Sequence, residues 1–224
     1  MIAKLDPEPA INPSPSYCIR FGATYGWNER FLIPVPFYAS DETTNENIYM
    51  SVMWAHDWFP KELDRAYGYT PAIPYISDRY CSISLRMGFP SESPLYSTFI
   101  NTTVDMQTGT IVFLDDLIDV NEKLAKRILT SGIARNVGSS PDTFRRDRDP
   151  FSQYYLNTFD TEDVLGYLRA CSVPFDAENY VDKPTFWLEA DRLYLVNVLP
   201  APPNAAICYI SLYDLEHFLK VDRW

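Results

Sequence analysis

The stretch from residue 103 to residue 119, "TVDMQTGTIVFLDDLID", constrains the fold more than any other part of this sequence. The stretch begins at the end of a segment with alternating apolar and polar residues. It continues with "DMQTG" and "TIVFL" and is followed by paired aspartates. Gly109 can supply the positive φ that a tight reversal needs, and Asp105 can accept hydrogen bonds from turn amides. We therefore expect two antiparallel strands joined by this turn, then a short helical turn capped by Asp115 or Asp116.

The first hundred residues are expected to be mainly extended chain. They hold 11 of the 18 prolines, which disfavour helices. Alternating or β-branched segments predict strands at residues 17–21, 48–54, 80–87 and 95–105. The segment "FLIPVPFYAS" is apolar but contains two prolines, so it suits an edge strand. An aromatic loop, "AHDWFPKEL", is predicted after the strand at 48–54.

Two helices are marked by their capping residues. Asn121 can begin the helix "EKLAKRILTSG", and Gly132 is a typical stop signal. Asp160 and Asp163 resemble a capping box at the start of "DTEDVLGYLRAC", whose apolar residues repeat at helical spacing.

The last segments predict a closing strand and helix. "TFWLEADRLYLVNV" reads as two strands around a turn, and residues 205–210 read as a final strand. Ser211 with Asp214 can begin a terminal helix, "LYDLEHFL". The predicted fold class is α+β, a mostly antiparallel sheet with two or three packed helices.

Three stretches resemble a known family, the extracytoplasmic domain shared by lysozyme-responsive anti-sigma factors and some peptidoglycan deacetylases of Gram-positive bacteria. They are "VDMQTGTIVFLDDLID", which is similar to the family pattern D-x-x-T-G-x-x-x-x-L-x-D-L-F, "FWLEADRLYLV" and "AAICYISLYDLEHFL". Two features depart from the family: "MGFPSESP" replaces a G-G-A-H segment, and Ile118 stands where Phe is common. The matching motifs are structural, so the resemblance implies a fold more directly than an activity.

The resemblance and the composition together suggest a domain organisation. Residues 1–16, rich in proline and serine, read as a linker or leader remnant, with a native cytosolic start as the competing reading. Residues 17–74 would be a variable N-terminal region, and residues 75–224 the α+β domain that forms one compact unit with it. No run of about 18 apolar residues, the length of a membrane-spanning helix, is present.

The net charge excludes some classes of partner, and the spacing of the cysteines excludes some kinds of site. A formal net charge of −11 argues against nucleic acid and anionic membranes, and leaves cationic proteins, sugars and neutral small molecules. The four cysteines lie far apart in the sequence without a CxxC pair, which argues against a zinc ribbon or a thioredoxin-type site. The sequence is compatible with two states of these cysteines: buried free thiols or two disulfides.

The chain carries no familiar catalytic signature. The motifs HExxH, GxSxG, the P-loop and GxGxxG are all absent, so we expect neither an enzyme nor a cofactor or metal site. Ligand binding is predicted instead at two loops: one carries His56 and Trp58, the other Phe89 and Glu92. By alternation with Ile48 and Val52, the side chain of Trp54 is expected in the core. The charged loop "FRRDRDP" is read as solvated rather than as an anion site.

The resulting hypothesis is a non-catalytic, extracytoplasmic sensor or binding domain of the cell envelope, secreted or membrane-anchored. Its partner, as the resemblance implies, would be a cationic protein such as lysozyme, or a peptidoglycan-related ligand. The alternative is an accessory module that binds cell-wall glycan for a wall-modifying deacetylase or hydrolase.

Overall fold

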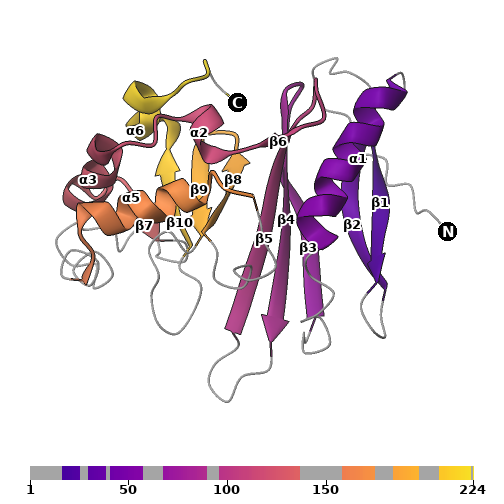
Figure 1. Cartoon of the computed structure of the whole chain (residues 1–224), viewed down its shortest axis with the longest axis horizontal. Coiled ribbons are helices and arrows are strands. Elements are labelled where there is room, and N and C mark those ends of the chain that lie inside the picture. The colour runs from indigo at the N-terminus through magenta and orange to yellow at the C-terminus, as the bar shows by residue number, and fades with distance from the viewer. Residues whose placement is uncertain are drawn as a thin grey trace.

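The computed structural model describes residues 17–25, 30–38, 41–57, 68–89, 96–136, 158–174, 184–196, 207–222 and 224. These residues form an α+β fold, as the sequence predicts, and their strands pair antiparallel in three sheets (Figure 1). The helices are α1 (Glu42–Asp57), α2 (Leu114–Leu117), α3 (Glu122–Ser131), α5 (Thr161–Ala170) and α6 (Leu212–Leu215), the last followed by a 3₁₀ turn, Glu216–Phe218.

The sheets follow the chain from one end of the molecule to the other. A hairpin contains β1 (Tyr17–Tyr25) and β2 (Arg30–Tyr38). The central sheet has the order β3-β4-β5-β6, formed by Gly68–Ile76, Tyr80–Phe89, Tyr96–Asp105 and Ile111–Val112. The C-terminal sheet has the order β7-β10-β9-β8, formed by Arg135–Asn136, Ile207–Ser211, Arg192–Val196 and Thr185–Glu189.

The prediction of a strand at residues 48–54 is wrong, because these residues lie within α1. Asp41 begins this helix by accepting hydrogen bonds from the backbone N–H and the hydroxyl of Thr44. Ile48 and Val52, one helical turn apart, are fully buried. The apolar residues of 48–54 alternate with others and also recur at helical spacing. Periodicity alone therefore could not distinguish a strand from a helix. Residues 55–57 of the predicted aromatic loop are also helical, and the rest of that prediction lies outside the described residues.

The tight turn after β5 forms as expected and also holds α1. Gly109 has φ +75°, and Asp105 Oδ1 accepts hydrogen bonds from the backbone N–H groups of Gln107 and Thr108 at 2.8 and 3.1 Å. On the helix, Ser51 Oγ donates to the Gly109 carbonyl at 2.7 Å. A Cβ on Gly109 would lie 2.4 Å from Asn47 Cβ, so only glycine allows this close approach.

The end of the same stretch joins the C-terminus. The backbone N–H of Asp119 donates to the Phe218 carbonyl, and that of Lys220 donates to the Leu117 carbonyl. Asp116 contributes to the start of α2 by accepting from the N–H of Phe113 at 2.8 Å, although Phe113 itself occupies the N-cap position. One short segment thus links α1, the central sheet and the C-terminal segment.

The capping predictions for the second half are confirmed. Asn121 accepts from the Leu124 N–H at 3.0 Å to begin α3, which ends at Gly132 with φ +57°. Asp160 and Asp163 form a capping box at the start of α5. Ser211 begins α6. The strands β8 and β9 surround the predicted turn.

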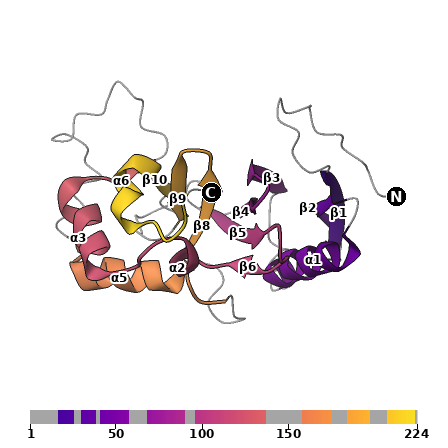
Figure 2. The ribbon, with the colours of Figure 1, turned by 90° about the horizontal axis from the view of Figure 1, so that it is seen from above.

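The two larger hydrophobic cores among the described residues lie on the α1 side of the central sheet and within the C-terminal half. We call the first the α1 core; it consists of Ile33, Val35, Ile48, Val52, Met53, Cys81, Ile83, Val104 and Met106. The second, the C-terminal core, is formed mainly by α2, α3, α5, α6 and strands β8 to β10. Viewed from above, α1 and α5 lie toward the same side of the molecule, with β6 and α2 between them (Figure 2).

None of the four cysteines forms a disulfide. Burial raises the pKa of the Cys81 thiol well above its usual range and that of Cys208 to about 12, so both stay protonated at neutral pH. Among the described residues, no helix is long and apolar enough to cross a bilayer.

Candidate functional site

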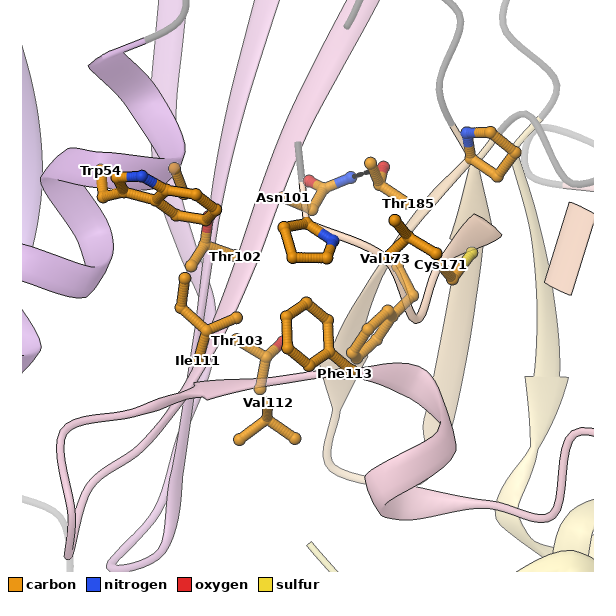
Figure 3. A pocket seen from close by; sticks show the side chains of 14 residues that line it. Trp54, Asn101, Thr102, Thr103, Ile111, Val112, Phe113, Cys171, Val173 and Thr185 are labelled. Atoms are coloured by element: carbon orange, nitrogen blue, oxygen red, sulfur yellow. Dashed lines mark hydrogen bonds between the residues drawn. The ribbon is translucent and has the colours of Figure 1, made fainter. Parts of the chain in front are cut away.

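A groove lies where three parts of the chain meet: the end of α1, the strands β5 and β6, and the segments on either side of the α5–β8 connection (Figure 3). Trp54 comes from α1, Asn101 and Thr102 from β5, Val173 from the segment after α5, and Thr185 from β8. The cavity between these walls has a volume of about 30 Å³, enough for about two water molecules. It could therefore admit a small group from a larger ligand.

The rim of the groove exposes large apolar side chains. Trp54 is 39% exposed and Val173 is 55% exposed. The structure shows four clearly exposed large hydrophobic residues among those it describes, and these two border the same groove. Trp54 occupies this position because α1 turns its Ile48 and Val52 side toward the core. The expectation that Trp54 belongs to the core is therefore wrong.

Polar side chains form the wall along β5. Successive residues of a strand face opposite sides, so Thr102 lies on the face of Val104 and the α1 core, whereas Asn101 faces β8. Asn101 Nδ2 donates to Thr185 Oγ1 at 2.8 Å, an interaction that joins the central sheet to the C-terminal sheet (Figure 3). Both Asn101 and Thr102 are buried, at 6% and 3% exposure.

Two oxygens in this wall have no hydrogen-bond partner. Among the described residues, Asn101 Oδ1 and Thr102 Oγ1 are buried and unpaired. A polar atom that loses water without gaining a partner costs about 1–3 kcal/mol, so such atoms are uncommon in folded proteins. The two atoms lie on opposite faces of β5, and both are closed to a water-sized group in this conformation, so they are internal polar atoms beside the groove rather than contact points inside it.

The lining contains no acid–base machinery. Its described residues include no histidine, carboxylate or amine, and the one cysteine, Cys171, donates its S–H to the Tyr167 carbonyl. No group of three histidine, cysteine or acidic residues that could hold a metal occurs among the residues that the structure describes. The arrangement offers an exposed indole and an uncharged set of described lining residues.

A second aromatic cluster is built into the fold instead. Trp187 stacks on Tyr194 with ring centroids 4.7 Å apart, and Phe99 extends the stack from β5. Trp187 and Tyr194 are 9% and 8% exposed, so their contact area serves packing between the two larger sheets. Burial raises the pKa of the Tyr194 hydroxyl.

The predicted site residues lie mostly beyond what the structure describes. Trp58, Glu92 and the loop "FRRDRDP" fall outside the described residues. The backbone of His56 belongs to the last turn of α1 and that of Phe89 to the end of β4, but their side chains also fall outside them. Binding at these four residues stays a prediction. Trp54 was missed because its segment reads as a strand, and a helical reading from Asp41 would have found it.

No protein-family model matches this sequence, and no curated protein matches it. Two crystal structures of DUF3298 family proteins, an uncharacterised domain, are similar to this chain over most of their length. One, from Bacteroides fragilis, has a TM-score of 0.46 and 9% identity, over 92% of this chain and 93% of that chain. The other, from Pseudomonas aeruginosa, has a TM-score of 0.40 and 12% identity, over 93% and 95%. The likeness assigns neither a site nor an activity to this chain.

Proposed function

We propose that this chain is a non-catalytic binding domain of the bacterial cell envelope, located outside the cytoplasm, whose partner is a cationic protein such as lysozyme. The observation that carries the binding role is the pair of exposed apolar side chains, Trp54 and Val173, on the rim of one groove. Exposed tryptophans of this kind commonly anchor protein interfaces.

Charge supports a cationic partner. The chain carries a formal net charge of −11, and the exposed Asp115 follows closely after Phe113, which lines the groove. Opposite net charges steer two proteins together and speed their encounter, and salt weakens the attraction. The family resemblance of the sequence points to the same partner.

A second function is favoured by one feature of the groove. The exposed indole of Trp54 is also suited to a sugar ring, which has apolar faces. In that case the domain would be an accessory module that brings a wall-modifying deacetylase or hydrolase to glycan.

Isothermal titration calorimetry with lysozyme, at low and at physiological salt, tests the first proposal. We expect saturable, stoichiometric heat at both salt concentrations, with weaker affinity at the higher one. The variant Trp54→Ala should weaken binding at least about tenfold, as removal of an interface anchor does. Met50→Ala is the matched control, because Met50 is 60% exposed on the same helix but does not line the groove.

A second basic protein, cytochrome c, controls for charge alone. Heat that appears only at low salt, or that is equal for lysozyme and cytochrome c, would show general attraction between acidic and basic proteins and would contradict the proposal. Equal lysozyme binding by the Trp54→Ala variant would remove the groove rim from the interface.

A further inference from the structure

The outer edge of β1 lacks the features that usually protect the edge of a sheet. Strand β1 pairs with β2 through all nine of its residues without a bulge, and no other described strand pairs with it. It is the outermost strand at one end of the molecule (Figure 1). Edge strands are commonly protected by prolines, bulges or several charges. Strand β1 contains no proline, and Arg20 is its only charged residue.

The prolines of β2 show which backbone groups of β1 point outward. Pro34 lies opposite Phe21 and Pro36 opposite Ile19, and proline has no N–H. Because hydrogen-bonded pairs alternate with non-hydrogen-bonded pairs in an antiparallel ladder, these two pairs must be of the second kind. The N–H and C=O groups of Ile19 and Phe21 therefore point away from β2. The same holds for residues 17, 23 and 25, and no described residue pairs with these backbone groups.

We propose that this edge is a dimer interface, in which β1 pairs antiparallel with β1 of a second copy of the chain about a two-fold axis at Phe21. Residue 21 then lies opposite residue 21 of the second copy, 19 opposite 23 and 17 opposite 25, so all the outward backbone groups form hydrogen bonds. The dimer contains a four-stranded sheet with the order β2-β1-β1-β2. Since the axis is perpendicular to this sheet, both copies of α1 lie on the same face of it.

A second copy fits this edge over its whole length, and one register does so. An axis at Arg20 would place two arginines opposite each other, which is unfavourable, and would pair only residues 17–23. An axis at Gly22 would pair only residues 19–25. With the axis at Phe21 all nine residues pair, and Arg20 lies opposite Gly22 of the second copy, which has no side chain.

The salt dependence separates this interface from the binding of a cationic protein. Each copy carries a formal net charge of −11, so two copies repel each other and salt screens the repulsion. Self-association should therefore strengthen as the salt concentration rises, whereas lysozyme binding should weaken. The dimer does not rest on the binding role proposed above, and failure of either proposal leaves the other standing.

Analytical ultracentrifugation of the purified full chain over a range of concentrations tests the dimer. We expect the mass to rise with concentration to twice the 25.8 kDa of one chain. Ile19→Pro should weaken self-association at least about tenfold, because it removes an outward N–H while keeping the hydrogen bonds to β2. Ile19→Ala is the matched control: it also removes the side chain but keeps the N–H, so it should still dimerise. Thermal melting followed by circular dichroism checks that both variants are folded.

Cross-linking tests the register in a Cys18→Ser background, which removes the one cysteine that is not buried. Phe21→Cys should form a covalent dimer on oxidation, because opposite residues of a hydrogen-bonded pair have Cα atoms about 5.5 Å apart, within the range of a disulfide. Ile19→Cys should not, since residue 19 lies opposite residue 23 and the two cysteines would be about 13 Å apart along the strands. Non-reducing gel electrophoresis measures both, and this test does not require the proline variant to fold.

The mass of one chain at every concentration up to about 1 mM would overturn the second copy as the occupant and leave an extended peptide of another protein as the alternative. A dimer that Ile19→Pro leaves intact, or that Ile19→Ala weakens equally, would contradict pairing through the outward backbone groups of β1. Cross-linking of Ile19→Cys without cross-linking of Phe21→Cys would contradict the axis at Phe21.

Discussion

The two faces of the central sheet use the same strands but are joined to their neighbours by different interactions. Toward α1 and β2, residues such as Cys81, Ile83 and Val104 are fully buried and apolar. Toward β8, the buried residues include Ser82, Asn101 and Thr103. Apolar packing therefore dominates on the side of α1 and β2, and side-chain hydrogen bonds position β8 on the opposite side.

The polar face joins sheets that are distant in sequence. Ser82 Oγ accepts from the Leu188 N–H at 3.0 Å and shares a hydrogen bond with Thr103 Oγ1. An apolar interface of this size tolerates small shifts, whereas hydrogen bonds fix the position of β8 along the sheet. The groove lies where these two kinds of interface meet.

The largest effect is expected at the turn that holds α1 against the sheet. Gly109→Ala should lower the free energy of unfolding by about 3 kcal/mol or more, because its φ is +75° and the new Cβ would lie 2.8 Å from the Ile48 backbone nitrogen. Urea denaturation followed by circular dichroism measures the loss.

Gly132→Ala is the matched control at the end of α3. Its φ is also positive, at +57°, but nothing lies within 4 Å of a Cβ built there. Backbone strain alone should cost about 1 kcal/mol. A loss for Gly109→Ala no greater than that for Gly132→Ala would show that the close contact with α1 is unimportant.

A second comparison measures the two faces at adjacent positions of β4. Ser82→Ala leaves the Leu188 N–H and the Thr103 hydroxyl without a partner, so it should cost about 2 kcal/mol. Ile83→Val removes one methylene from the α1 core and should cost about 1 kcal/mol. Equal losses in urea denaturation, or a larger one for Ile83→Val, would contradict the view that hydrogen bonds dominate the β8 side.

The same substitution on opposite faces of β5 should change stability in opposite directions. Thr103→Val breaks the bond with Ser82 and should lower the free energy of unfolding by about 1 kcal/mol. Thr102→Val removes a buried hydroxyl without a partner and should raise it by up to about 1 kcal/mol. Thermal and urea denaturation measure both variants. A loss in Thr102→Val would show that its hydroxyl is satisfied in solution, for example by an ordered water.

The sequence predicts the second half of the chain better than the first half. The second half is marked by local chemistry: Asn121, Asp160 and Ser211 each cap the helix that the sequence predicts. A cap depends on a few neighbouring residues, so it can be read without knowledge of the tertiary structure.

In the first half, α1 was missed because its pattern fits two structures. Ile48, Val52 and their neighbours satisfy both alternation and helical spacing, and the preceding prolines favoured the extended reading. The cap at Asp41 was the overlooked signal. The turn within residues 103–119 forms as the sequence predicts, but its contact with α1 depends on packing that no local pattern shows.

The groove could be predicted only in part. The sequence predicts binding at a loop with His56 and Trp58 and places Trp54 in the core, whereas the exposure of Trp54 depends on α1 being a helix. The unpaired oxygens of Asn101 and Thr102 depend on tertiary packing, and they could not be inferred from composition or spacing.

The smallest expected effect concerns acid and separates the caps of α1 and α3. Hydrogen bonds from Thr44 hold the pKa of the Asp41 carboxyl below its ordinary value of 3.8. A lowered folded-state pKa stabilises the protein above pH 3.8, and this contribution is lost as the pH falls through the lower value. Asn121, which caps α3, does not titrate. Wild type should therefore lose more stability than Asp41→Asn between about pH 5 and about pH 2.5 in urea denaturation.

The reciprocal variant tests whether the carboxyl itself is responsible. Asn121→Asp places a titrating acceptor on the Leu124 N–H, so it should add to the acid-induced loss of stability, whereas Asp41→Asn should reduce it. Other carboxyl groups titrate equally in all three proteins, so their effects cancel in the comparison. Parallel stability curves for wild type and Asp41→Asn would mean that the cap of α1 does not stabilise the fold through its charge, leaving packing against Gly109 as the main interaction that holds this helix.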